Sequence, residues 1–191
     1  MTVIRRSGRG TAGEESVPDV LSNGVGGTPP GMCFDVLERS IDSPMTVVTA
    51  GNGVERSGCL VGFWTQCSIE PLRCVIMLSK ANHTFRVARF APTLAVHVLR
   101  EADQALAERF GAETGDDTDK FAGLAWNIGP GGAPVLEGVD WFAGTVGQVY
   151  DVGDHVAVII DVLTNVGNHG RAHEHQLDSR TAQSIPAGHA P

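Results

Sequence analysis

The sequence predicts a mostly β domain of the α+β kind, in which an antiparallel sheet forms a barrel or sandwich with a few short helices. Six short runs rich in Val, Ile, Thr and aromatic residues alternate with Gly and Pro breaks. The helical crossovers that a parallel sheet needs between all of its strands are missing. A length of 191 residues, of which 42% are apolar and 19% charged, suits one such compact domain.

The six runs are predicted to be strands because breaking residues stand between their β-branched and aromatic stretches. In chain order they are residues 45–50, 58–65, 73–79, 93–100, 141–150 and 155–164.

Three helices are expected between these strands, at residues 32–39, 84–90 and 102–110. Pro44, Pro92 and Gly111 follow them in turn, and both residue types stop helices. In the third helix Ala102, Leu106 and Phe110 recur at four-residue spacing, so one apolar stripe can face the sheet.

The two ends of the chain differ in composition from the predicted domain, which covers residues 31–166. Residues 1–30 are rich in Gly, Ser, Thr and Pro without an apolar period, and we expect a flexible leader there. Residues 167–191 form a polar tail that contains histidines, within which Ile185 and Pro186 are candidates for local docking.

The charge balance argues against nucleic acid as a partner. Lys and Arg number 14 against 22 Asp and Glu, giving a net charge of −8 and a field that repels polyphosphates. The longest apolar run, residues 156–160, is strand length, and the start of the chain lacks the apolar segment of a signal peptide. We therefore expect a cytoplasmic protein that does not interact with membranes.

The cysteines and most of the histidines do not indicate a metal or disulfide site. No CxxC pair occurs, and buried reduced thiols are expected at Cys33, Cys59, Cys67 and Cys74. His97 lies inside an apolar strand and is expected to be a hydrogen-bonded core or interface residue. His169, His173 and His175 lie in a polar stretch, and no dedicated metal site is expected there, because His173 and His175 are two residues apart and do not share a helix face.

The segment from Ser79 to Thr84 is a candidate anion site, because it lies between a predicted buried strand and a helix. Asn82 or Thr84 can cap that helix, while Lys80 and the hydroxyls of Ser79 and Thr84 add charge and hydrogen bonds. A small phosphate is the ligand suited to such a site.

A second candidate segment, residues 62–68, ends a strand with bulky aromatic residues beside small polar ones. Such a strand end can place backbone N–H and C=O groups along the edge of a planar heterocycle, with Thr65 and Ser68 reaching a polar tail. Phe63 and Trp64 point to opposite faces of a strand, so at least one of them is expected to pack in the core.

Seven collinear segments resemble the flavin reductase-like family, and the resemblance covers residues 32–164. The segments are SPMTVVT at 43–49, GFWTQCSIEP at 62–71, LSKANHT at 78–84, LAVHVL at 94–99, DKFAG at 119–123, GAPVLEG at 132–138 and GDH at 153–155. The resemblance implies a six-stranded antiparallel split β-barrel of the FMN-binding type. A barrel this small leaves little room inside for FMN, so a homodimer with the flavin at the subunit interface is expected.

The resemblance also implies an activity, namely an NAD(P)H:flavin oxidoreductase that transfers hydride from NADH or NADPH to FMN or FAD. A partner monooxygenase would use the reduced flavin. The flavin and ribityl contacts carried over are Trp64, Thr65, Gln66, Cys67 and Ser68. The phosphate-side contacts are Ser79, Lys80, Asn82 and Thr84, and His155 matches a histidine near the nicotinamide and the flavin face.

Departures from the family pattern leave two other functions open. Phe63 and Gln66 replace small serines, Leu72 replaces a proline, and Ile160 stands where a glycine is common. One alternative is an oxidoreductase that retains a flavin or deazaflavin and reduces an unknown organic acceptor. The other is a flavin or haem carrier without turnover.

Overall fold

The computed structural model describes residues 42–167, 170–171 and 173–188. The chain divides into two units, Met1–Glu38 and Arg39–Pro191, and all described residues belong to the second. The predicted leader, the helix expected at residues 32–39, Cys33 and His169 lie outside the described residues.

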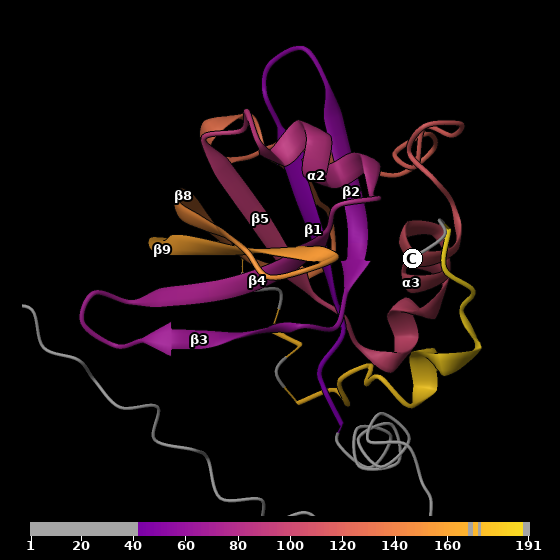
Figure 1. Cartoon of the computed structure of the whole chain (residues 1–191). Helices are drawn as coiled ribbons and strands as arrows, with labels where there is room; N and C mark the ends of the chain where they lie inside the picture. Colours follow the sequence, from indigo (N-terminus) through magenta and orange to yellow (C-terminus); the bar gives the residue numbers. More distant parts are fainter. Residues whose placement is uncertain (1–41, 168–169, 172, 189–191) are drawn as a thin grey trace, which may run out of the picture. The chain divides into compact units, whose positions relative to one another are not determined.

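The main sheet has seven strands in the order β2-β1-β5-β8-β9-β4-β3, and every neighbouring pair is antiparallel. Their bounds are β1 Thr46–Gly51, β2 Arg56–Val61, β3 Trp64–Ser68, β4 Arg73–Ser79, β5 Thr93–Val98, β8 Asp140–Asp151 and β9 His155–Gly167. The sheet curls, because β2 at one edge contacts β4 near the other, and in Figure 1 β3 and β4 run across the direction of β1 and β2. The predicted mostly β, antiparallel fold with few helices is confirmed.

The strand count differs from the predicted six for two physical reasons. The run at residues 58–65 is two strands, since Val61 pairs with Thr46 of β1 whereas Trp64 pairs with Ile76 of β4. That run passes from one edge of the curled sheet to the other, and it breaks at residues 62–63 in doing so. The short pair β6 Trp126–Ile128 and β7 Pro134–Leu136 was not predicted, because three-residue strands beside Gly and Pro give no period.

The helices begin close to the predicted positions. Helix α2, His83–Ala88, starts after Asn82, whose Oδ1 accepts a hydrogen bond from the Thr84 N–H at 3.0 Å. Helix α3, Gln104–Ala112, begins two residues later than predicted. A 3-10 turn, η1 Glu101–Asp103, precedes it, and the Arg100 N–H donates to Asp103 Oδ2 at 2.8 Å.

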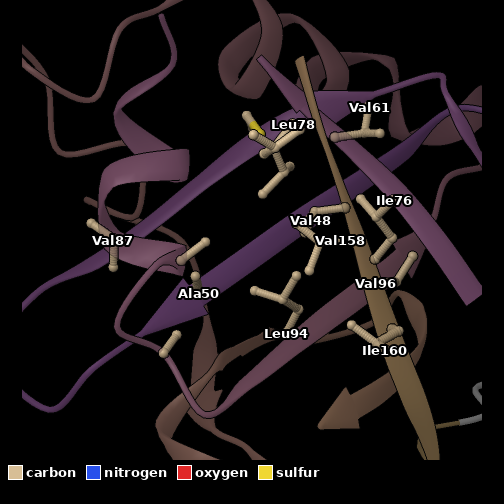
Figure 2. Packing of buried hydrophobic residues seen from close by; sticks show 14 of the residues in the cluster. Val48, Ala50, Val61, Ile76, Leu78, Val87, Leu94, Val96, Val158 and Ile160 are labelled. Atoms are coloured by element: carbon tan, nitrogen blue, oxygen red, sulfur yellow. The ribbon is translucent and has the colours of Figure 1, made fainter. Parts of the chain in front are cut away.

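The core fills the concave side of the sheet with branched aliphatic side chains. Figure 2 shows residues of β1, β4, β5 and β9 meeting there, among them Val48, Ile76, Leu94, Val96 and Ile160, which are all fully buried. Val87 of α2 closes one side of this cluster. A second cluster lies under α3, where Phe110 packs against Phe121 with ring centroids 5.4 Å apart.

Part of the predicted polar tail packs onto the domain. Leu177 is fully buried, and its N–H donates to Leu99 O at 3.0 Å while its carbonyl accepts from the Met45 N–H at 2.8 Å. Ile185, named from the sequence as a docking candidate, packs against the second cluster. The turn η3 Thr181–Ser184 lies between these two contacts.

Two predictions about buried residues can be compared directly with the structure. His97 is fully buried, and Leu136 N–H donates to its Nε2 at 3.0 Å, so Nδ1 carries the proton and donates to Val47 O at 2.9 Å. The prediction of a hydrogen-bonded core histidine is confirmed. Cys59 and Cys74 are buried as predicted, but Cys67 is exposed because it lies at a β-bulge in the edge strand β3.

No helix in the part of the chain that the structure describes is long and apolar enough to cross a membrane. In the same part, no three or more His, Cys, Asp or Glu side chains gather so as to hold a metal ion.

Candidate functional site

Strand β3 is an edge strand, and this position leaves part of its backbone free to bind a ligand. Its only strand neighbour among the described residues is β4. The Met77 N–H donates to Phe63 O at 2.9 Å, so the backbone groups of Phe63 point toward β4. Because successive residues of an antiparallel strand point their backbone groups to opposite edges, those of Trp64 and Gln66 face outward.

A pocket of about 430 Å³ lies beside this strand. Its lining is mainly apolar: Pro44, Trp64, Thr65, Gln66, Leu72, Cys74, Phe142 and Val162. Trp64 is held in place by a hydrogen bond from Nε1 to Pro44 O at 2.9 Å and by a tilted contact with Phe142. A pocket of this size and lining suits a flat aromatic ring system, since small-molecule sites range from roughly 300 to 1,000 Å³.

The structure brings three of the five predicted flavin contacts into this pocket, namely Trp64, Thr65 and Gln66. Cys67 and Ser68 follow on the same strand but do not line it. Gln66 Nε2 donates to Ser68 O at 3.1 Å across the bulge. The sequence did not single out Cys74, Phe142 or Val162, because the strands that carry them approach β3 only through the sheet topology.

The predicted phosphate-side loop connects β4 to α2. Ser79 Oγ accepts from the Ala81 N–H at 3.3 Å, and the Asn82 N–H donates to Ser79 O at 3.1 Å. These contacts shape a tight turn before the helix. Ser79, Lys80 and Asn82 are all at least partly exposed, so their side chains reach the surface.

Thr84 differs from the other loop residues, because its side chain is fully buried. Its hydroxyl forms a hydrogen bond with the Ser57 hydroxyl at 2.9 Å, and its backbone N–H is bonded to Asn82. Both of its donors therefore have partners inside the protein. The prediction that Thr84 contacts a phosphate does not fit this geometry, in which Thr84 anchors the loop to β2.

Lys80 and His155 form one polar cluster with two aspartates. The Lys80 Nζ lies 2.7 and 2.8 Å from the two oxygens of Asp151, and the Lys80 N–H donates to Asp154 O at 2.9 Å. His155 Nδ1 lies 2.9 Å from Asp154 Oδ1, and this hydrogen bond, more than any other contact, lowers the pKa of Asp154. The register explains the proximity, since Ser79 pairs with His155 across β4 and β9.

Phe63 connects the polar cluster to the pocket. It directly precedes Trp64, and its ring meets His155 edge-on with centroids 5.9 Å apart. Phe63 is 55% exposed, whereas Trp64 packs against the core. The two neighbours thus point to opposite faces of the strand, with Phe63 on the outer face. Among the described residues His155 Nε2 has no hydrogen-bond partner and is available to a ligand.

A second pocket, also of about 430 Å³, lies by α2, and its lining is mainly polar and includes two pairs of side chains in contact with each other. Arg56 pairs with Asp119 at 2.7 Å, and His83 Nδ1 lies 2.8 Å from Asp116 Oδ1. Arg86 and His83 hydrogen-bond to Asp116 and lower its pKa to about 2. Two carboxylates of the acidic stretch at residues 113–119, Asp116 and Asp119, are thus engaged in surface ion pairs.

Comparison with known proteins shows the family that this chain resembles in sequence. A sequence model described as the flavin reductase like domain matches residues 38–181. An NADH:FMN oxidoreductase from Rhodococcus erythropolis is 31% identical over 152 residues, which cover 75% of this chain and 77% of the relative. The reductase subunit HsaB of a flavin-dependent monooxygenase from Mycobacterium tuberculosis is 29% identical, over 60% of each chain.

Solved structures show the same fold. The NADH:FAD oxidoreductase SgcE6 of Streptomyces globisporus C-1027 superposes with a TM-score of 0.66 at 23% identity, covering 76% of this chain and 87% of that one. The chain spans only 41% and 59% of the lengths of two other curated relatives, both flavin reductases by description.

Proposed function

Because this chain belongs to the flavin reductase like domain family, we propose that it is an NAD(P)H:flavin oxidoreductase that passes hydride from a nicotinamide nucleotide to FMN or FAD. One observation carries the proposal: an edge strand with outward backbone groups borders an apolar pocket of about 430 Å³. The names of the relatives, which include an NADH:FMN oxidoreductase, support it. When bound, the flavin supplies the ring that accepts the hydride.

We assign the following roles to the residues of the chain. Backbone groups of Trp64 and Gln66 hydrogen-bond to the polar edge of the ring, with Thr65, Cys67 and Ser68 along the ribityl chain. Ser79, Lys80 and Asn82 bind the phosphate, and Thr84 holds their loop against Ser57. His155 orients the nicotinamide through its free Nε2 or by stacking, because hydride transfer depends mainly on the approach of the two rings.

We further propose that the curled sheet is a split β-barrel of the FMN-binding type and that the protein works as a homodimer. Large apolar side chains are exposed on the two hairpins β3–β4 and β8–β9: Ile69, Leu72, Val149, Tyr150 and Val152. The two hairpins adjoin because β4 pairs with β9, but the register places their exposed apolar turns at opposite ends of that pair, so a second copy would have to lie along the pair to remove both from water. A monomeric mass in light scattering together with full flavin affinity would exclude the dimer.

The reduced flavin is proposed to serve a partner monooxygenase, since the Mycobacterium relative is named as the reductase subunit of one. The location predicted from the sequence, the cytoplasm, remains part of this proposal.

The deciding experiment is NADH and NADPH oxidation by the purified protein with and without added FMN, with the absorption spectrum of the isolated protein recorded beside it. We expect turnover that depends on added flavin. Bound flavin in stoichiometric amount with no turnover of added flavin would favour the flavin- or deazaflavin-retaining oxidoreductase instead. Tight flavin binding without oxidation of either nucleotide would indicate a carrier.

A further inference from the structure

The lysine of the proposed phosphate loop already has an anionic partner within the chain. Lys80 Nζ contacts both carboxylate oxygens of Asp151, at 2.7 and 2.8 Å. The Gly153 N–H donates to Asp151 Oδ1 at 3.1 Å and holds the carboxylate in this orientation. These contacts, that of Lys80 first, lower the pKa of Asp151, so the carboxylate is ionised at neutral pH.

The other charges nearby do not restore a positive field. Asp154 lies against the same loop through the hydrogen bond from the Lys80 N–H to its carbonyl, and its carboxylate is bonded to His155. Lys80 therefore lies in a cluster with two carboxylates, those of Asp151 and Asp154, and with the imidazole of His155. A phosphate that enters this loop meets a lysine whose charge is already matched.

We propose that Asp151 sets the affinity for the flavin phosphate by competing with it for Lys80. This inference rests on the proposed function, because it assumes that the loop binds the phosphate of a flavin. Its consequence is that the phosphate adds less to flavin binding than a free lysine would allow. A flavin held in this way leaves readily, which suits a reductase whose product is used by another protein.

The expected size of the effect follows from the exposure of the pair. The Lys80 side chain is 38% exposed and that of Asp151 is 73% exposed. Exposed ion pairs shift an equilibrium by up to about fivefold, so releasing Lys80 should tighten FMN binding by about two- to fivefold. Riboflavin has the same ring and ribityl chain without the phosphate, and its affinity should not change.

The test is the substitution Asp151→Asn in the full chain, with dissociation constants for FMN and riboflavin measured by quenching of flavin fluorescence. Asparagine keeps Oδ1 for the Gly153 N–H and removes only the charge. The matched control is Asp119→Asn, because Asp119 makes the same two kinds of contact as Asp151. It forms an ion pair with a basic side chain, that of Arg56 at 2.7 Å, and it accepts a hydrogen bond from the backbone N–H two residues later, that of Phe121. We expect the ratio of riboflavin to FMN dissociation constants to rise only for Asp151→Asn, and to return to the wild-type ratio in high salt.

A second comparison separates competition for Lys80 from simple loss of negative charge. In a Lys80→Met background, Asp151→Asn should no longer change FMN binding, because the residue for which the two anions compete is gone. An equal gain in that background, or an unchanged ratio in the single variant, overturns the inference while leaving the reductase proposal intact. A wild-type protein that binds neither flavin and oxidises no nicotinamide nucleotide defeats both.

Discussion

His97 should make the stability of this domain fall when the pH is lowered from 8 to 5. Its imidazole is fully buried between Val47 O and the Leu136 N–H, and burial lowers the pKa of His97 to about 4 from an ordinary 6.5. The neutral ring suits both partners, since Nδ1 donates and Nε2 accepts. Protonation would turn Nε2 into a donor facing another donor.

The sign of the effect follows from the lowered pKa. The unfolded chain takes up the proton near pH 6.5, whereas the folded protein resists it until the pH reaches about 4. The contribution of His97 to stability is thus complete above the unfolded pKa and declines below it. The two pKa values correspond to a loss of about 2 kcal/mol at pH 5 and of about 3 kcal/mol below pH 4.

The assay is urea unfolding of the wild type and of His97→Gln at pH 8 and pH 5. Glutamine has an acceptor oxygen and a donor NH2 group but does not titrate, so it removes the pH dependence due to residue 97 whatever its cost in stability at pH 8. The difference between the two pH values should be about 2 kcal/mol larger in the wild type. If both proteins lose the same free energy of unfolding, the histidine does not carry a depressed pKa and the reasoning is refuted.

Three further substitutions test the site and the packing. His155→Ala should raise the KM for the nicotinamide nucleotide or lower kcat by about tenfold, the equivalent of one lost contact, with FMN affinity unchanged; normal steady-state kinetics would remove His155 from the site. Leu177→Ala should lower the free energy of unfolding by about 2–5 kcal/mol, because Leu177 is fully buried; a loss near zero in urea unfolding would show that the tail segment does not support the domain. Gly144→Ala should cost about 1–3 kcal/mol, since a Cβ there would lie 2.7 Å from Ile160 Cδ1; an unchanged melting temperature would contradict this close approach.

Five of the seven strands of the main sheet could be predicted one by one from the sequence because each carries its own signal, whereas β2 and β3 were predicted as one run. Residues 73–79 contain the continuous apolar run CVIML, whose strand length and β-branched residues are visible without knowledge of the neighbours. The contacts of Leu177 were not visible, because a single leucine in a polar stretch has no period and depends on Met45 and Leu99 for its two backbone hydrogen bonds. The same holds for Asp151, whose partner Lys80 lies 71 residues away in the chain.

The candidate site shows the same division between local and long-range information. The helix cap at Asn82 follows from the local sequence, and the structure has it. The role of Thr84 does not follow from the local sequence. Its hydroxyl bonds to Ser57, and only the position of β2 in the fold shows that this side chain points inward and not to the surface. Sequence could therefore locate the loop, and only the packing could decide which of its side chains face outward.

Phe63 shows why a departure from a family pattern needs the sheet register before its effect can be judged. Taken by itself, a phenylalanine in place of a small serine suggests less space over a bound ring. The register places it opposite Met77, which pairs with Ala157, so its ring reaches His155 two residues along β9. The departure and the proposed nicotinamide contact are thus parts of one aromatic pair, which the register of β3, β4 and β9 brings together.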